Sequence, residues 1–164
     1  MSLIKTITID DFYSKEQAQQ LVAATYNLQY TQHDFGKQLQ DFNLLPPDAD
    51  ALFSTALNKS LTVIEDNSGV FRIPKALIHF EGFDSTNEWV FAVALQESTF
   101  NLFEHKSGAK TALDNYKLNY TNLFDWDLTV NYILKPGQGI MFRPWLFHSF
   151  DSGLIQMFRL NEKL

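Results

Sequence analysis

The stretch from Lys135 to His148 reads KPGQGIMFRPWLFH, and its order of residue types is typical of a β-rich fold. Pro136-Gly137 predicts a tight turn, and the apolar residues 140–142 after it predict a buried strand. Before the turn, apolar side chains alternate along residues 128–134, as they do in a strand with one covered face. The stretch therefore predicts two strands joined by a turn, with a histidine shortly beyond the second strand.

Further strand patterns lie on both sides of this stretch. Residues 89–96 are apolar at nearly every position, which indicates a strand buried on both faces. The other segments with strand-like patterns are 3–9, 71–83, 99–103 and 154–160. The stretch from Tyr30 to Asn43 is polar with scattered aromatics, and it predicts irregular structure or short strand.

Two helices are predicted before most of these strands. Ser14 and Gln17 have the spacing of a capping box for a helix that runs to Thr25. After Pro46-Pro47, residues 48–61 repeat apolar side chains at helical spacing. Helices first and strands after them predict an α+β fold, a double-stranded β-helix (a jelly-roll or cupin-like barrel), with two N-terminal helices packed on one sheet.

His79 and Glu81 are the first candidate metal ligands. They are two residues apart, so on a strand both side chains would point to the same face. A second imidazole from His148 would complete a set of two histidines and one carboxylate, which leaves open positions on ferrous iron. The alternative for each histidine is a hydrogen-bonded structural role, but a glutamate against a core is costly unless a cation or water receives it.

The chain resembles the Fe(II)/2-oxoglutarate-dependent dioxygenases in the order of these residues. His79-Phe80-Glu81 is followed by His148 after 69 residues (148 − 79) and by Arg159 after a further 11 (159 − 148). Residues 7–17 also resemble the opening of prolyl-hydroxylase-like members of that family. The resemblance implies that His79, Glu81 and His148 bind Fe(II) and that Arg159 binds the distal carboxylate of 2-oxoglutarate. Glu81 departs from the family, where aspartate is commoner.

Arg159 has its own signal in the strand pattern. Alternation along 154–160 places it on one face with Ile155 and Met157, and an arginine on an apolar face needs an anion. That anion is either a co-substrate carboxylate or an acidic side chain of the protein itself. Arg143 and Arg72 are rival candidates for the clamp, but neither has the family's spacing.

Two further side chains and one segment are candidate parts of the site. His105 is the main competing ligand, but its position predicts solvent exposure or a substrate contact, and His33 is predicted to lie on the surface. Asp84 replaces Glu81 only if the strand ends early. The segment 106–125, rich in asparagine and aromatic residues, is long for a plain connection and is predicted to be a lid.

Composition limits the class of protein. With 164 residues, 45% of them hydrophobic, the expectation is a single domain over 1–164. A formal charge of −6 disfavours non-specific binding to nucleic acid. The chain has no cysteine, no secretion signal and no apolar run of membrane-spanning length, so a cytoplasmic protein is expected.

The predicted function follows from the resemblance. It is hydroxylation of an unknown substrate, a small molecule or a protein side chain, with decarboxylation of 2-oxoglutarate to succinate; the sequence does not indicate an oligomeric state. Two alternatives remain: a degenerate cupin-like barrel that binds a partner without redox chemistry, and a cupin enzyme that uses Zn, Mn or Ni. The second alternative would not need Arg159 as a clamp.

Overall fold

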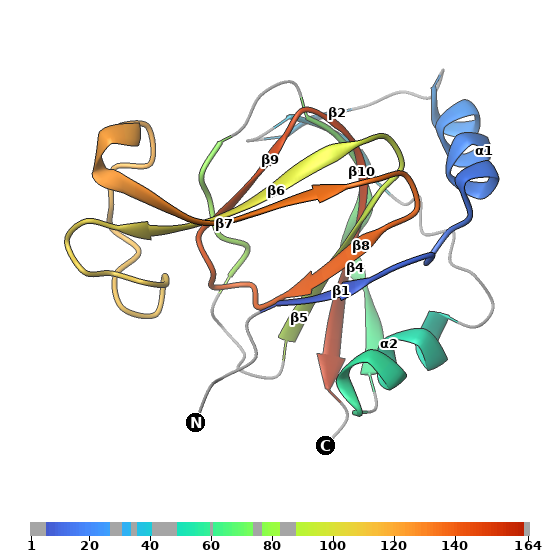
Figure 1. Cartoon of the computed structure of the whole chain (residues 1–164), viewed down its shortest axis with the longest axis horizontal. Helices are drawn as coiled ribbons and strands as arrows, with labels where there is room; N and C mark the ends of the chain where they lie inside the picture. Colours follow the sequence, from blue (N-terminus) through green and yellow to red (C-terminus); the bar gives the residue numbers. More distant parts are fainter. Residues whose placement is uncertain are drawn as a thin grey trace.

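The computed structural model describes residues 6–26, 31–33, 36–40, 49–59, 61–73, 77–82 and 88–162, which form two antiparallel sheets and two helices (Figure 1). The elements in chain order are β1 Thr6–Ile9, α1 Lys15–Thr25, β2 Thr31–His33, β3 Gly36–Gln40, α2 Ala49–Leu57, β4 Leu61–Ile73, β5 Glu88–Ala94, β6 Ser98–His105, the 3-10 turn η1 Leu123–Asp125, β7 Trp126–Leu134, β8 Gly139–Phe142, β9 His148–Asp151 and β10 Gly153–Glu162. The larger sheet has the order β1-β8-β5-β10-β4-β3-β2, and the smaller sheet has the order β7-β6-β9.

The two helices cover one face of the larger sheet. In α1 the Ser14 side chain accepts from the Gln17 backbone N–H, and the Gln17 side chain accepts from the Ser14 N–H, so the predicted capping box is confirmed. Ala18 and Leu21 of α1 and Phe53 of α2 are buried in the same core as the larger sheet. The prediction of two N-terminal helices on one sheet is therefore confirmed.

The second helix is shorter than the pattern predicted. It ends at Leu57, and the next residue, Asn58, has a φ of 52°, a left-handed conformation that commonly ends helices. Leu61, which continued the helical spacing in the sequence, instead begins β4. The pairing of β4 with β10, and not the local periodicity, determines the strand conformation of Leu61.

Strand β5 separates two cores, as its continuous apolar sequence predicted. Trp89 and Phe91 face the helices, whereas Val90 and Ala92 face the smaller sheet. The space between the sheets is filled mainly by large apolar side chains, among them Phe100 of β6 and Phe142 of β8. This inner core is the surface against which the candidate ligands lie.

One predicted strand, 71–83, is wrong as a single element. β4 ends at Ile73, and residues 77–82 form a separate extended segment whose one β-bridge joins His79 to His148. Pro74 stands between the two parts in the sequence, and a proline cannot donate a hydrogen bond within a sheet. In the described part of 30–43, the short strands β2 and β3 pair with each other.

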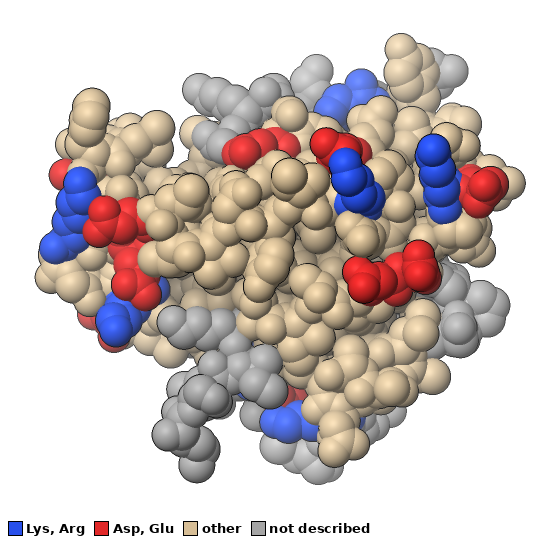
Figure 2. Space-filling model, in the orientation of Figure 1, with Lys and Arg blue, Asp and Glu red and all other residues tan. Residues whose placement is uncertain are grey.

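The surface carries charges of both signs in small groups. Figure 2 shows one face of the molecule, with Lys and Arg close to Asp and Glu at several places around its margin. Within the ranges given above, no helix is long and apolar enough to cross a membrane.

Candidate metal centre

Two backbone segments that lie far apart in the chain are joined at the site. The N–H of His79 donates to the carbonyl of His148 at 2.9 Å, and the N–H of His148 donates back to the carbonyl of His79 at 2.9 Å. The N–H groups of Glu81 and Gly82 both donate to the carbonyl of Pro144, at 2.7 and 3.1 Å. Four backbone hydrogen bonds therefore fix the segment 77–82 against the start of β9 and the loop before it.

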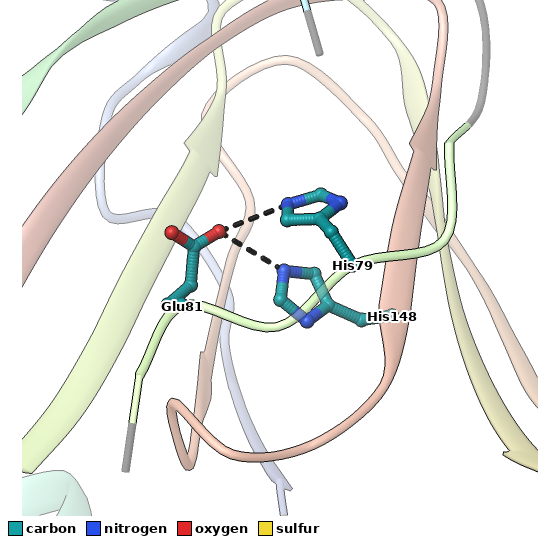
Figure 3. A group of neighbouring side chains, drawn as sticks. All are labelled: His79, Glu81 and His148. Atoms are coloured by element: carbon teal, nitrogen blue, oxygen red, sulfur yellow. Dashed lines mark hydrogen bonds and ion pairs between the residues drawn. The ribbon is translucent and has the colours of Figure 1, made fainter. Parts of the chain in front are cut away.

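The three predicted ligands converge (Figure 3). The Nε2 atom of His79 lies 3.0 Å from Oε1 of Glu81, and the Nε2 atom of His148 lies 3.2 Å from the same oxygen. The three possible ligand atoms lie within 4.8 Å of one another. His79, Glu81 and His148 are thus brought to one place, as the sequence pattern predicted.

Both imidazoles are held in the tautomer that a metal needs. Nδ1 of His79 lies 2.8 Å from the carbonyl of Leu77, and Nδ1 of His148 lies 2.8 Å from the carbonyl of Leu146. A carbonyl only accepts, so each Nδ1 carries a proton, and each Nε2 of a neutral ring has a lone pair to offer. Neither orienting carbonyl could be predicted from the sequence, because each lies only two residues before its histidine, a spacing too common to be a signal.

Burial and charge set the protonation of the site. His148 is fully buried, with ring contacts to Phe100, Phe142 and Phe150, and desolvation, together with the charge of His79, keeps its pKa below the ordinary 6.5. Burial raises the pKa of Glu81, but hydrogen bonds and charges from the two histidines outweigh it and hold that pKa well below its usual range. Glu81 is therefore a carboxylate at neutral pH.

The arrangement fits a divalent cation. Two imidazole lone pairs and a carboxylate oxygen point to one place, and acceptors alone cannot satisfy one another without a proton or a metal ion between them. Two nitrogens and one oxygen are the ligand set of ferrous sites that keep open positions. Glu81 supplies the carboxylate oxygen of this set.

Arg159 points into the site, not to solvent. Its Nη2 donates to the backbone carbonyl of Glu81 at 3.2 Å and lies 3.3 Å from the carboxylate of Glu88. Its Nη1 lies 3.8 Å from Oε2 of Glu81. Gly82 permits this approach, because a Cβ there would lie 3.2 Å from Nη2 of Arg159.

Glu88 is a site residue that the sequence analysis missed. It is the first residue of β5, and its carboxylate occupies one side of the Arg159 guanidinium. A clue existed in its position, since an acidic residue begins an otherwise apolar strand. Both predicted kinds of partner for Arg159 therefore stay relevant: a protein carboxylate contacts it, and a co-substrate would have to share or replace that contact.

The rival residues make other contacts. Arg143 stacks on Trp89 and bonds Glu162, and Arg72 lies over the ring of Tyr26 at 5.9 Å. His105 bonds Ser107 and packs edge-on against the ring of Trp126, apart from the ligand group. Asp84 lies outside the described residues, and so does the side chain of His33.

The segment 106–125 packs behind the ligand residues. Thr111 forms a β-bridge with Leu146, and the ring of Tyr120 lies 6.2 Å from that of Phe80. Phe80 stands between His79 and Glu81 in the chain and belongs to a separate apolar cluster with Phe147. The contacts of this segment therefore support the ligand-bearing backbone from outside; its predicted role as a lid stays a prediction.

No family model matches the chain, and no curated protein matches it by sequence. Solved structures do match. HygX from Streptomyces hygroscopicus with nickel and 2-oxoglutarate bound has a TM-score of 0.61 at 12% identity, over 96% of this chain and 82% of that one. SnoN, a non-haem α-ketoglutarate-dependent epimerase from nogalamycin biosynthesis, has 0.65 at 12%, over 96% and 78%.

A prolyl-4-hydroxylase from Pseudomonas putida has a TM-score of 0.50 at 9% identity, over 97% of this chain and 92% of that one. Together these likenesses show the fold. The chain has the fold of Fe(II)/2-oxoglutarate-dependent enzymes, as the order of its motifs predicted.

Proposed function

We propose that this protein is an Fe(II)/2-oxoglutarate-dependent dioxygenase built on a double-stranded β-helix. One observation carries the proposal: the Nε2 atoms of His79 and His148 and an oxygen of Glu81 converge while both Nδ1 atoms are bound to carbonyls. The imidazoles are thus oriented for a metal before it arrives, which lowers the cost of binding. The similar fold of HygX, which has been seen with 2-oxoglutarate, supports the choice of co-substrate.

Each residue has a role in the proposal. His79, Glu81 and His148 bind Fe(II), and Arg159 binds the distal carboxylate of 2-oxoglutarate through its planar pair of N–H donors. With Fe(II) and 2-oxoglutarate bound, the site would support a hydroxylation. In it, 2-oxoglutarate, dioxygen and a substrate C–H group give succinate, carbon dioxide and the corresponding alcohol. The aromatic side chains around His148 keep water from that side of the metal position.

The substrate in this proposal is a small molecule or a protein side chain. The formal charge of −6 argues against a nucleic-acid backbone as the recognised feature. Residues around the open metal positions would select the substrate. The segment 106–125 would influence their placement, because it pairs with the backbone at Leu146, close to His148.

The test needs no known substrate. The purified protein is titrated without oxygen with Fe(II) and then 2-oxoglutarate, and the weak visible charge-transfer band of the chelate is recorded. Oxygen is then admitted, and slow conversion of 2-oxoglutarate to succinate is followed by NMR. Wild type should show both signals, His148→Ala neither, and Arg159→Ala a weakened band that needs more 2-oxoglutarate.

Other outcomes select the alternatives. Metal binding without a band or succinate would replace the proposal by a cupin-like enzyme that uses another divalent metal. A protein that binds no Fe(II), Mn(II), Ni(II) or Zn(II) would instead be a metal-free binding module, with His79, Glu81 and His148 as an internal ion-pair cluster.

A further inference from the structure

The smaller sheet has a second face, turned away from the metal ligands. His148 begins β9 and points inward, so the next residue, Ser149, points outward. On this outer face lies a pocket of about 320 Å³, and Ser149 and Asp151 of β9, Asn101 of β6 and Asn131 of β7 line it. The volume is at the lower end of the range for small-molecule sites.

The floor of the pocket is a polar row that crosses all three strands. Asn101 is paired in register with Asn131 on one side and with Ser149 on the other. Nδ2 of Asn131 donates to Oδ1 of Asn101 at 2.7 Å, and Nδ2 of Asn101 donates to Oγ of Ser149 at 3.2 Å and to Oδ1 of Asp151 at 3.1 Å. Because Asn101 and Ser149 are buried, these bonds fix the row rigidly.

The row leaves both donors and acceptors for a ligand. Asn131 uses one N–H, and in the described part of the chain its carbonyl oxygen and second N–H bond no protein group. Asp151 receives one hydrogen bond from Asn101 and has no ion-pair partner among the described residues. Neutral groups that donate and accept at once, such as hydroxyls, match this mixture better than groups that only donate or only accept.

The walls are apolar. Ile78, Phe103, Leu123 and Leu128 line the pocket, and the two leucines are 66% and 56% exposed. Such exposed leucines beside a polar floor are suited to a ligand with both C–H and hydroxyl faces. No Lys, Arg or His lines the pocket, and Figure 2 shows a broad uncharged area over β6 and β7.

We propose that this outer pocket binds a neutral, polyhydroxylated ligand, of the chemical class of sugars. Asn131 and Asp151 would hold adjacent hydroxyl groups, and Phe103 with the leucines would cover the ring's C–H face. The site is separate from the metal centre, since it lies on the opposite side of the same three strands. It does not depend on the proposed oxygenase activity.

The test uses 15N-labelled protein and NMR. Methyl glycosides of common hexoses and short neutral oligosaccharides are titrated, with n-butylamine and butyrate as cationic and anionic probes. Saturable shifts of the Asn101 and Asn131 side-chain amides are expected with at least one sugar. Asp151→Asn and Asn131→Leu should each weaken that binding by about tenfold, because each removes hydrogen bonds to the ligand.

Asp127→Asn is the matched control, because Asp127 is an exposed acid of β7 that does not line the pocket. It should bind the sugar as wild type does, and all variants should keep the wild-type NMR spectrum of the inner core. The proposal is overturned if no sugar gives saturable shifts at these side chains. It is also overturned if n-butylamine shifts them and sugars do not, which would identify a cation site.

Discussion

Arg159 and Arg143 both lie beside Glu88, yet their surroundings differ. Arg143 is enclosed: its guanidinium lies 3.8 Å from the centre of the Trp89 ring, and its N–H groups reach the carbonyl of Glu88 and the carboxylate of Glu162. Arg159 instead contacts the ligand residue Glu81 and the carboxylate of Glu88.

In the proposed function, this difference separates Arg143, which stabilises the fold, from Arg159, which binds the co-substrate. The partners of Arg143 include the rings of Trp89 and Trp145, the Glu88 carbonyl and the Glu162 carboxylate, which also bonds Trp89 and Lys59, so these contacts join parts of the fold to one another. The partners of Arg159 include a side chain that converges with two histidines on one point. Exposure does not distinguish them, because their side chains are 18% and 13% exposed.

The largest effect is expected from removing the candidate ligand His148, which contacts Glu81 as Arg159 does. His148→Ala should weaken binding of Co(II), measured by calorimetry, by about 100-fold or more, since losing a direct ligand costs more than losing a group that only hydrogen-bonds to a ligand. His105→Ala is the matched control and should leave binding unchanged. If His148→Ala binds Co(II) as wild type does, the Arg159 region is an internal ion-pair cluster and the contrast with Arg143 fails.

The next effect tests the two arginines directly. Arg159→Ala should raise the dissociation constant for 2-oxoglutarate in the anaerobic Fe(II) protein by roughly 100-fold, because two charge-assisted hydrogen bonds are lost. Arg143→Ala should leave it unchanged. A larger loss of 2-oxoglutarate affinity in Arg143→Ala than in Arg159→Ala would mean that Arg143 binds the distal carboxylate.

The free energy of unfolding should depend more on Arg143 than on Arg159. Arg143→Ala should lower the free energy of unfolding by on the order of 2 kcal/mol, because it removes the stacking on Trp89 and leaves Glu162 with fewer partners. Urea denaturation measures the loss, and Arg143→Lys should lie between, since it keeps the charge but not the planar stack. Equal losses in Arg143→Ala and Arg159→Ala would mean that both arginines are structural.

The sequence could predict this contrast only through spacing and alternation. Arg159 shares the inner face with Ile155 and Met157, as the period of two predicted, because β10 pairs without interruption with β5. His148 was placed correctly for a similar reason: the turn and the strand before it are regular and local.

The other features of the site could not be predicted from the sequence, because they depend on contacts between distant segments. His79 and Glu81 do point to one side, but on an extended segment held by His148 and Pro144, not on the predicted strand. Glu88 became a site residue because the fold brings the start of β5 to the end of β10. The outer pocket likewise needs three strands in register, which no local pattern specifies.

The smallest effect comes from pH, in the Arg143 region. Desolvation raises the pKa of Glu162, but hydrogen bonds from Trp89 and Lys59 and the nearby positive charges outweigh it and lower that pKa below 4.5. A carboxyl with a depressed folded pKa adds stability that is fully present above the unfolded value and lost as the pH falls through the folded value.

The difference in urea midpoint between wild type and Glu162→Gln should therefore be constant from neutral pH down to about 4.5 and shrink below it. Taking the difference removes the parallel titration of Glu81, which both proteins share. A difference that stays constant or grows as the pH falls below 4.5 would mean that Arg143 and Lys59 do not stabilise the Glu162 carboxylate, and that the stacking on Trp89 alone holds Arg143 in place.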